Sequence, residues 1–273
     1  MIDIHCHILP GLDDGPESLD EAMEMCLRAA EDGVRTIVAT PHFKPGTYEC
    51  AGADILAAVA ALNEAIEKEG LELRICTGAE VAVSPEMQAC LRPEGYLTIN
   101  KGRYFLAEFP PLSVPSHWDA FLLSFLDAGM RPIIAHPERN AWFITHREAL
   151  AAAVQSGLMV QITATSVTGG FGPEARDFSA YLLSHNLVHA IASDGHSADL
   201  RPALLAEAAG IAADLIGKER ATALTTSIPQ AIIENRPIPA WEPVTAFVPA
   251  RVSDTPWFRR VIRPYLPAYR KMS

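Results

Sequence analysis

The sequence contains no run of about 18 apolar residues, the length that a membrane-spanning helix needs. Its first residues also lack the basic stretch and following apolar stretch of a secretory signal peptide. The five cysteines are odd in number and form no C-x-x-C pair, which argues against a disulfide framework or a zinc knuckle. We therefore expect a cytoplasmic protein whose fold depends on a packed core.

Basic residues are scarce as well. The chain has 22 Lys and Arg against 33 Asp and Glu, a formal net charge of −11, so nothing provides the broad basic surface that a nucleic acid requires. An anionic substrate is still compatible with this charge, because bound metal ions dominate the field around them. With 273 residues, 49% of them hydrophobic, the chain can bury a large core, and we expect one α/β domain over residues 1–236.

Short apolar segments alternate with longer amphipathic ones, which is typical of βα units around a parallel sheet. The expected strands are Ile2–Ile4, Thr36–Ala39, Leu73–Cys76, Tyr104–Ala107, Pro132–Ala135, Met159–Ile162 and Ala190–Ala192. The expected helices are Leu19–Glu31, Ala53–Glu69, His117–Asp127, Arg147–Gln155, Ala175–Ser184 and Pro202–Leu215. Ser18 and Glu21 form a plausible capping box for the first helix. Seven strands predict a distorted seven-stranded barrel related to the eight-stranded (β/α) barrel.

Metal-ligating residue types follow almost every expected strand. In the opening stretch MIDIHCHILPGLDDG, His5 and His7 lie two apart and so share one face of a strand, while Asp13 and Asp14 follow in a turn. Beyond the later strands come His42, Glu80, Glu108, His136, and Asp194 with His196. Because the carboxyl ends of parallel strands converge on one rim, these side chains would repel one another unless cations lay among them.

Each member has an ordinary alternative when it is taken singly. His42 could be a loop histidine, Glu80 or Glu108 a satisfied carboxylate, and Asp194-Gly-His196 a turn. The shared position at strand ends favours a metal site over these alternatives. The remaining histidines lie off the strand ends and are interpreted as surface or packing residues: His117, His146, His185 and His189.

The ligand set combines imidazole and carboxylate without thiolate, which favours Mn²⁺, Fe²⁺ or Zn²⁺, with Mn²⁺ and Mg²⁺ gaining as oxygen ligands accumulate. Nine candidate side chains, with one carboxylate counted from Asp13 and Asp14, exceed what one ion accepts, so we expect two or three ions, with Glu80 as the bridging carboxylate. Clustered divalent ions produce hydroxide from bound water at neutral pH, which suits phosphoester hydrolysis. No Cys-x5-Arg signature occurs, so a cysteinyl-phosphate route is not expected.

A phosphate also needs positive groups beside the metal ions. Arg139 lies three residues past His136, and Arg201 lies five residues past His196. A guanidinium matches the oxygens of a phosphate and the charge that develops on them. Alternatively, Arg139 pairs with Glu138 or with another carboxylate of the rim.

Six motifs together resemble the PHP superfamily, and within it the bacterial metal-dependent tyrosine phosphatases encoded with capsule and exopolysaccharide genes. They are MIDIHCHILPGLDDGP, the TPH ending at His42, the GAE ending at Glu80, EF at Glu108, AHPER ending at Arg139 and ASDGH ending at His196. The resemblance covers Met1 to about Asn235. It implies a distorted seven-stranded barrel and a trinuclear site, usually with manganese.

Carried over by motif, the resemblance assigns three sets of ligands. One ion would be held by His5, His7, Glu80 and Asp194, a second by Glu80, Glu108 and His136, and a third by Asp14, His42 and His196. Arg139 and Arg201 match the family's phosphate-binding arginines. The implied substrate is the phosphotyrosine-rich tail of a membrane-linked tyrosine autokinase. A homo-oligomer is compatible with the sequence.

Two features depart from the pattern. Cys6 stands where relatives commonly have serine, and we expect it to face away from the metals. Residues 237–273 are rich in proline and aromatics, with six basic residues, and are interpreted as an extension packed on the barrel or as a contact for an acidic partner or membrane.

The rival functions are a small-molecule phosphatase acting on a substrate such as histidinol phosphate, and a catalytically silent module that binds the phosphorylated tail.

Overall fold

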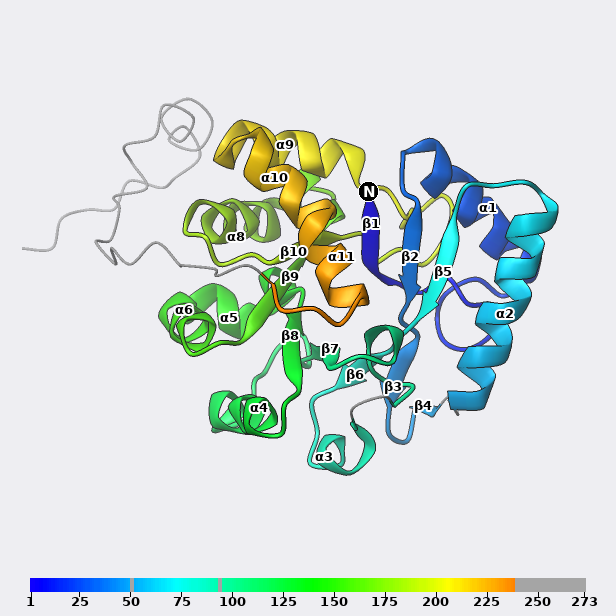
Figure 1. Ribbon diagram of the computed structural model, residues 1–273. Helices are drawn as coiled ribbons and strands as arrows, with labels where there is room; N and C mark the ends of the chain where they lie inside the picture. Colours follow the sequence, from blue (N-terminus) through cyan, green and yellow to red (C-terminus); the bar gives the residue numbers. More distant parts are fainter. Residues whose placement is uncertain (50–51, 93–94, 239–273) are drawn as a thin grey trace, which may run out of the picture. The chain divides into compact units, whose positions relative to one another are not determined.

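The computed structural model describes residues 1–49, 52–92 and 95–238, drawn in colour in Figure 1. The predicted extension at 237–273 therefore lies almost wholly outside the described residues, as does Cys50. The other four cysteines are free thiols. None of the described helices is long and apolar enough to cross a membrane.

The strands of the described residues form two sheets. The strands are β1 (Ile2–Cys6), β2 (Thr36–Ala39), β3 (His42–Lys44), β4 (Tyr48–Glu49), β5 (Arg74–Thr77), β6 (Glu80–Ala82), β7 (Tyr104–Glu108), β8 (Arg131–Ala135), β9 (Met159–Thr163) and β10 (Ala190–Ala192). One sheet has the order β1-β2-β5 and the other the order β10-β9-β8-β7-β6-β3-β4. Every pairing is parallel except the short hairpin of β3 and β4, which confirms the predicted parallel α/β architecture.

The two sheets meet where β1 passes β10. Cys6 and Gly195 form an isolated parallel bridge, the amide of His7 donates to the carbonyl of Gly195 at 2.8 Å, and the amide of Asp194 donates to the carbonyl of His5 at 2.8 Å. The carboxyl ends of β1 and β10 are thereby held side by side. Closure of all the strands into one seven-stranded barrel stays a prediction.

The expected strands at 36–39 and 73–76 do not simply end at the rim, and this corrects the prediction of seven strands. Each is followed by a break and a second short strand, β3 after β2 and β6 after β5. Pro41 interrupts the first pair because proline has no amide hydrogen for the ladder, although its carbonyl still accepts from the amide of Glu80 at 3.1 Å. His42 and Glu80 consequently begin new strands and are directly paired, His42 opposite Glu80.

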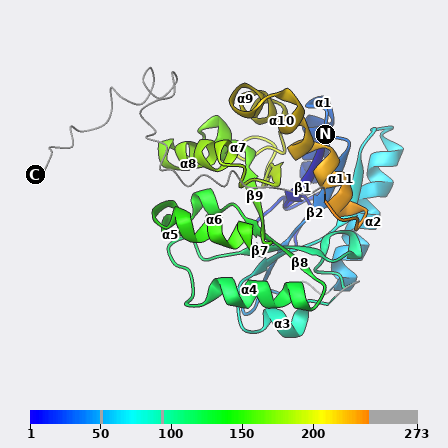
Figure 2. The ribbon, with the colours of Figure 1, turned by 60° about the vertical axis from the view of Figure 1, so that its left-hand side comes forward.

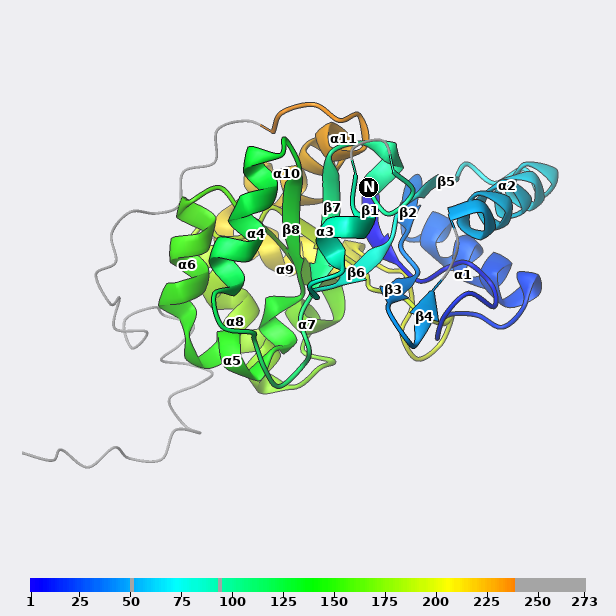
Figure 3. The same cartoon turned by 90° about the horizontal axis from the view of Figure 1, so that it is seen from below.

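Helices flank the strands on both sides. They are α1 (Leu19–Glu31), α2 (Gly52–Lys68), α3 (Met87–Cys90), α4 (Trp118–Asp127), α5 (Ala141–Thr145), α6 (Arg147–Gln155), α7 (Ala164–Thr168), α8 (Pro173–Ser184), α9 (Ala206–Ile216), α10 (Lys218–Thr225) and α11 (Ser227–Ile233), with 3-10 turns η1 (Ile99–Lys101) and η2 (Pro137–Arg139). Figure 3 shows α1 and α2 on one side of the strands and α4 and α6 on the other. Helices α7 and α8 lie beside each other (Figure 2).

The predicted helices all occur, and two of them, α1 and α6, have the predicted bounds. Half of the predicted capping box forms: the Ser18 hydroxyl accepts from the amide of Glu21 at 3.3 Å, whereas the Glu21 carboxylate accepts from the amide of Glu17. Helix α9 begins four residues later than predicted. The reason is tertiary, since Asp32 accepts from the amides of Leu205 and Ala206 and so caps the helix there.

The end of the described chain covers the amino-terminal side of the strands. Helix α11 lies near the start of β1 (Figure 1). The Tyr104 hydroxyl at the start of β7 donates to the carbonyl of Arg236 at 2.7 Å, and the side-chain amide of Asn100 donates to the carbonyl of Ile233 at 3.0 Å. The opposite ends of the strands, where the predicted ligands lie, are left to form the site.

Candidate metal centre

All nine side chains predicted as metal ligands lie together; most lie at or just beyond the carboxyl ends of strands, whereas His42 and Glu80 are the first residues of β3 and β6. The nine fall into four overlapping groups, within each of which the ligand atoms lie within 4.8 Å of one another. The groups are His7, Asp14, His42 and His196; His5, His7 and Glu80; His5, His136 and Asp194; and His42, Glu80 and Glu108. The cluster overlaps the grouping that the resemblance implies, but His7 also joins the Asp14 group and His42 joins the carboxylates of Glu80 and Glu108.

Backbone geometry helps to aim two of these residues. His136 has φ +30° and Asp194 has φ +53°. Both backbones therefore lie in the left-handed region, which residues other than glycine rarely adopt. His136 directly follows β8, and Asp194 lies two residues beyond the end of β10. Strained backbone of this kind persists where the surrounding structure enforces it, and it is commonly found at functional sites.

Glu80 is the centre of the cluster. Its Oε1 lies 2.8 Å from Nε2 of His136 and 3.4 Å from Nε2 of His5, while its Oε2 lies 3.1 Å from Nδ1 of His42. Glu80 is 1% exposed. The position of this carboxylate between histidines from three strands agrees with the bridging role predicted for it.

Two buried atoms here have no hydrogen-bond partner among the described residues, namely Oε2 of Glu80 and Nδ1 of His42. A buried polar atom without a partner is costly, and two of them 3.1 Å apart call for a shared partner. In addition, Nε2 of His5 and Nε2 of His7 lie 3.2 Å apart. Divalent cations held by the His5, His7 and Glu80 group and by the His42, Glu80 and Glu108 group would satisfy these atoms, so the residues present fit a metal site.

The residues alone left Asp13 and Asp14 both open, and the resemblance assigned Asp14. The structure places Asp14 in the cluster and Asp13 behind it. Asp14 Oδ1 lies 3.4 Å from Nε2 of His196 and 3.5 Å from Nε2 of His42, within the cluster. Asp13 Oδ2 lies 2.6 Å from Nδ1 of His7, on the far side of that ring. The amides of His42 and Gly15 donate to Asp13 and hold it in place. A carboxylate behind a ligating histidine sets its tautomer and strengthens it as a ligand.

Gln161 is a second residue that sequence reasoning missed, on β9, the one expected strand followed by no ligand. Its Oε1 lies 2.9 Å from Nδ1 of His5. An amide oxygen only accepts, so Nδ1 of His5 carries the hydrogen and its Nε2 presents a lone pair to the cluster. A buried glutamine in the apolar strand MVQIT was the available signal, because such a side chain requires a polar partner.

The charges of the cluster are strongly coupled. Burial disfavours the charged form of Glu80, but the neighbouring His5 and His136 outweigh it and hold its pKa well below the ordinary value. Likewise, burial opposes ionisation of Asp194, and the same histidines lower its pKa to about 2. Burial and the charge of Glu80 raise the pKa of Glu108. The centre therefore holds anionic carboxylates that bind a cation readily.

Both predicted arginines reach the cluster. Arg139 donates to Oδ2 of Asp194, and Arg201 forms an ion pair with the same atom at 2.7 Å while also donating to the carbonyl oxygen of Asp194 at 3.0 Å. The alternative pairing of Arg139 with Glu138 is wrong, because the Glu138 side chain is buried and accepts instead from the amide of Thr163. The alternative pairing with another carboxylate of the rim does occur, since Asp194 is that partner. Nε of Arg201 has no hydrogen-bond partner among the described residues, so this guanidinium has donor capacity to spare.

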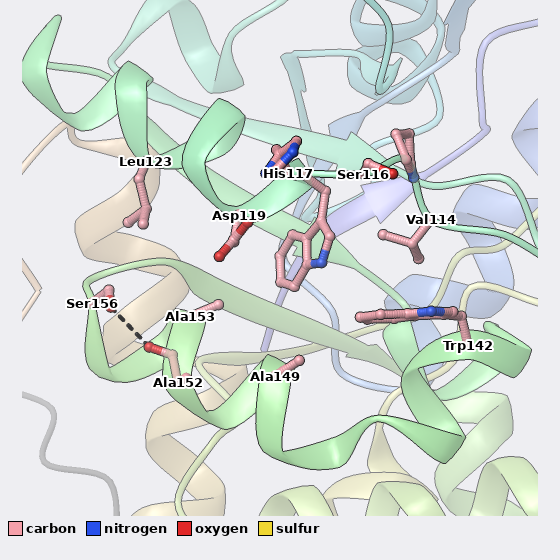
Figure 4. Close-up of a pocket in the computed structure, with 12 residues that line it drawn as sticks. Val114, Ser116, His117, Asp119, Leu123, Trp142, Ala149, Ala152, Ala153 and Ser156 are labelled. Atoms are coloured by element: carbon pink, nitrogen blue, oxygen red, sulfur yellow. Dashed lines mark hydrogen bonds between the residues drawn. The ribbon is translucent and has the colours of Figure 1, made fainter.

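The hollows of the surface differ in their relation to the cluster. A groove of about 600 Å³ is lined by Asp14, His196 and Arg201 together with the exposed Leu200, and it opens directly onto the predicted ligands. Another hollow, of about 360 Å³, lies between α4 and α6 and includes Trp142 (Figure 4). None of the residues lining that second hollow belongs to the cluster.

Other expectations about side chains are also met. Cys6 is fully buried and its Sγ lies 3.5 Å from the carbonyl of Gly195, so it faces away from the cluster. Burial raises the pKa of its thiol, which makes it a poor nucleophile. The four histidines interpreted as surface or packing residues belong to none of the four groups within the described part of the chain.

The family of capsular polysaccharide synthesis proteins CpsB/CapC matches residues 1–234. The chain belongs to the CpsB/CapC family. Tyrosine-protein phosphatase YwqE of Bacillus subtilis is 38% identical over 201 residues, 74% of this chain and 79% of the relative. Tyrosine-protein phosphatase CpsB of Streptococcus agalactiae is 32% identical over 243 residues, 86% of this chain and 99% of the relative.

Solved structures agree with this membership. A crystal structure from the set of YwqE from Bacillus subtilis and CpsB from Streptococcus pneumoniae, described as unique metal-dependent tyrosine phosphatases, has a TM-score of 0.85 at 35% identity. The match covers 89% of this CpsB/CapC chain and 98% of that one. A β-aspartyl dipeptidase from Fervidobacterium islandicum, at 16% identity and a TM-score of 0.51, shares the fold alone.

Proposed function

We propose that this CpsB/CapC chain is a metal-dependent phosphatase that hydrolyses phosphotyrosine on protein substrates. The observation that carries the proposal is the meeting of two arginines with a nine-residue cluster of histidines and carboxylates at Asp194. The named activity of relatives that match most of the chain supports the same reading. The specific substrate proposed is the phosphotyrosine tail of a membrane-linked autokinase of polysaccharide synthesis.

The proposed ligands are the nine residues of the cluster, with Glu80 bridging. Bound divalent ions would supply a nucleophile from water at neutral pH and neutralise charge on the phosphate. Manganese is the cofactor we propose, because the donors are nitrogen and oxygen atoms only. Asp13 and Gln161 hold His7 and His5 in the tautomers that present Nε2 to the cluster.

The arginines bind and orient the phosphate. In-plane N–H groups of Arg139 and Arg201 donate to phosphate oxygens and stabilise the charge that spreads over them during transfer. The phenolate of tyrosine leaves readily, since the pKa of a tyrosine hydroxyl is about 10. A strong general acid is therefore unnecessary, and the chain's role is mainly positioning and charge stabilisation.

The test combines metal analysis with phosphatase assays before and after chelation. Purified protein should contain about two to three divalent ions per chain and should release phosphate from a phosphotyrosyl peptide, as clustered-metal catalysis requires. Chelation should abolish the release, and Mn²⁺ should restore it better than Zn²⁺ or Mg²⁺. The variant H136A should lose both metal and activity, whereas the matched control H117A should keep both, because His117 is exposed and outside the cluster.

Three results would contradict the proposal. Activity that survives chelation would exclude a metal route. Faster turnover of histidinol phosphate than of the phosphotyrosyl peptide would identify a small-molecule phosphatase instead. Tight binding of the phosphopeptide without phosphate release, in protein fully loaded with Mn²⁺, would identify a silent binding module.

A further inference from the structure

Phe171 lies on the turn between α7 and α8, beside both arginines. Its ring centroid is 4.4 Å from Cζ of Arg139 and 5.7 Å from Cζ of Arg201, distances at which a cation is attracted to an aromatic face. We infer that Phe171 is a positioning residue that holds the guanidinium groups of Arg139 and Arg201 in place to receive phosphate. The inference rests on the proposed function, in which these arginines bind the phosphate.

Two backbone hydrogen bonds define the turn that carries Phe171. Gly169 and Gly172 both have φ +92°, a backbone angle that residues other than glycine rarely adopt. The amide of Gly172 donates to the carbonyl of Gly169 at 3.0 Å. The amide of Gly170 donates to the carbonyl of Thr165 at 2.8 Å. These two hydrogen bonds, rather than the glycines themselves, define the path of the turn that carries the half-buried Phe171.

The segment that carries Phe171 is connected by hydrogen bonds to the turn that carries Arg139. Glu138, the residue before Arg139 on η2, is fully buried. Its Oε1 accepts from the amide of Thr163 at 2.9 Å and from the hydroxyl of Ser166 on α7 at 2.7 Å. The turn that carries Arg139 and the helix that leads to Phe171 are therefore joined through one buried carboxylate, so the ring and the guanidinium keep their relative position.

Stacking on the ring suits the proposed task of the arginines. A guanidinium carries its N–H donors in one plane, so a ring against its face leaves the edges available to a phosphate. The side chains of Arg139 and Arg201 are 30% and 28% exposed, so they are not sealed from solvent. Without the ring, both side chains would gain rotamer freedom that phosphate binding must then remove.

The experiment measures binding of inorganic phosphate and hydrolysis of a phosphotyrosyl peptide by full-length, Mn²⁺-loaded protein. F171L and F171M keep apolar volume but remove the aromatic face, while F171Y and F171W keep the face. A hollow of about 240 Å³ beside Phe171 leaves space for the larger rings. The matched control is Y181L, which removes an aromatic contact of Arg147, 5.0 Å from the ring, outside the site.

We expect F171L and F171M to weaken phosphate binding and raise KM about five- to tenfold, as loss of a partly exposed cation–π pair predicts, with metal content unchanged. F171Y, F171W and Y181L should bind phosphate like the wild type. In a background carrying R139M and R201M, F171L should cause no further loss, because the groups it positions are gone.

Wild-type phosphate affinity in both F171L and F171M would overturn the inference, as would an equal loss from F171L in the arginine-free background. Failure of the proposed function looks different. Wild-type protein would then bind phosphate with the same dependence on Phe171, yet would release none from the phosphotyrosyl peptide.

Discussion

At the scale of single residues, Asp13 is the side chain whose importance depends most on its neighbours. Among the described residues it belongs to none of the four ligand groups but accepts from His7, which faces the cluster with its other nitrogen. Burial lowers the pKa of His7, but its hydrogen bonds to the Asp13 and Glu80 carboxylates outweigh burial and raise that pKa to about 10. A metal ion must displace that proton, and Asp13 keeps the remaining N–H oriented away from the ion.

We expect D13N to reduce Mn²⁺ affinity by about 10- to 100-fold, the usual effect of losing the carboxylate behind a ligating histidine. Competition with a fluorescent chelator at constant pH measures this directly. D20N is the matched control, because Asp20 lies exposed in the first turn of α1. Unchanged affinity in D13N would show that His7 is oriented by other groups.

His189 is a buried histidine away from the cluster, and it makes stability depend on pH. Burial lowers its pKa to about 3, and its Nδ1 accepts from the amide of Val160 at 3.1 Å. In the unfolded chain a histidine titrates near pH 6.5, so unfolded protein takes up the proton first as the pH falls. The contribution of neutral, buried His189 to the free energy of unfolding is therefore complete above about pH 6.5 and is lost progressively towards pH 3.

The variant H189Q should flatten the dependence of stability on pH between 6 and 4 by up to about 1.4 kcal/mol per pH unit relative to the wild type. Urea denaturation at several pH values provides the comparison. H117Q should run parallel to the wild type, because His117 is exposed. Parallel curves for H189Q and wild type would refute a buried neutral His189.

At the scale of elements, the break between β5 and β6 places Glu80. Gly78 lies in this break, and a Cβ added there would lie 2.7 Å from Cγ1 of Val38 and 3.3 Å from the carbonyl oxygen of Ala39. Glycine is needed because the two breaks, after β2 and after β5, approach each other closely. His42 and Glu80 can pair only if that approach is kept.

We expect G78A to lower the free energy of unfolding by about 1–3 kcal/mol through overpacking and to weaken Mn²⁺ binding by moving Glu80. The double variant G78A/V38A should recover part of the loss, since it removes the clashing methyl group. The control G210A lies in α9 with open space around it and should be neutral or slightly stabilising. Equal free energies of unfolding for G78A and the wild type would show that the backbone between β5 and β6 can move to accommodate the added methyl group without cost.

At the scale of the whole described unit, the site joins strands from both sheets. His5 and His7 come from β1 and the residue after it, whereas His42, Glu80 and Glu108 come from β3, β6 and β7 of the other sheet. Without a cation, burial of these ionisable groups and repulsion between like charges destabilise the folded chain. Metal binding should consequently stabilise the fold as well as supply the chemistry.

We expect Mn²⁺ to raise the melting temperature in a concentration-dependent way, with a gain of about 2.7 kcal/mol when free Mn²⁺ is 100 times its Kd. Differential scanning fluorimetry after chelation and metal titration measures the shift. E80Q should reduce it strongly, because Glu80 contacts histidines of both sheets. A shift in E80Q as large as in the wild type would argue against Glu80 as the bridging group.

The sequence by itself determined the parallel α/β class, most of the strands and helices, and the list of nine clustered side chains with both arginines. These features are local: the period of apolar residues defines a strand, and the residue after it lies at the rim. Only the tertiary structure decided what depends on chain segments far apart. It placed Asp13 behind His7, brought Gln161 to His5, split two strands at Pro41 and Gly78, and placed Phe171 beside two arginines. The physical reason is that such contacts depend on strand pairing and close packing, which no local pattern encodes.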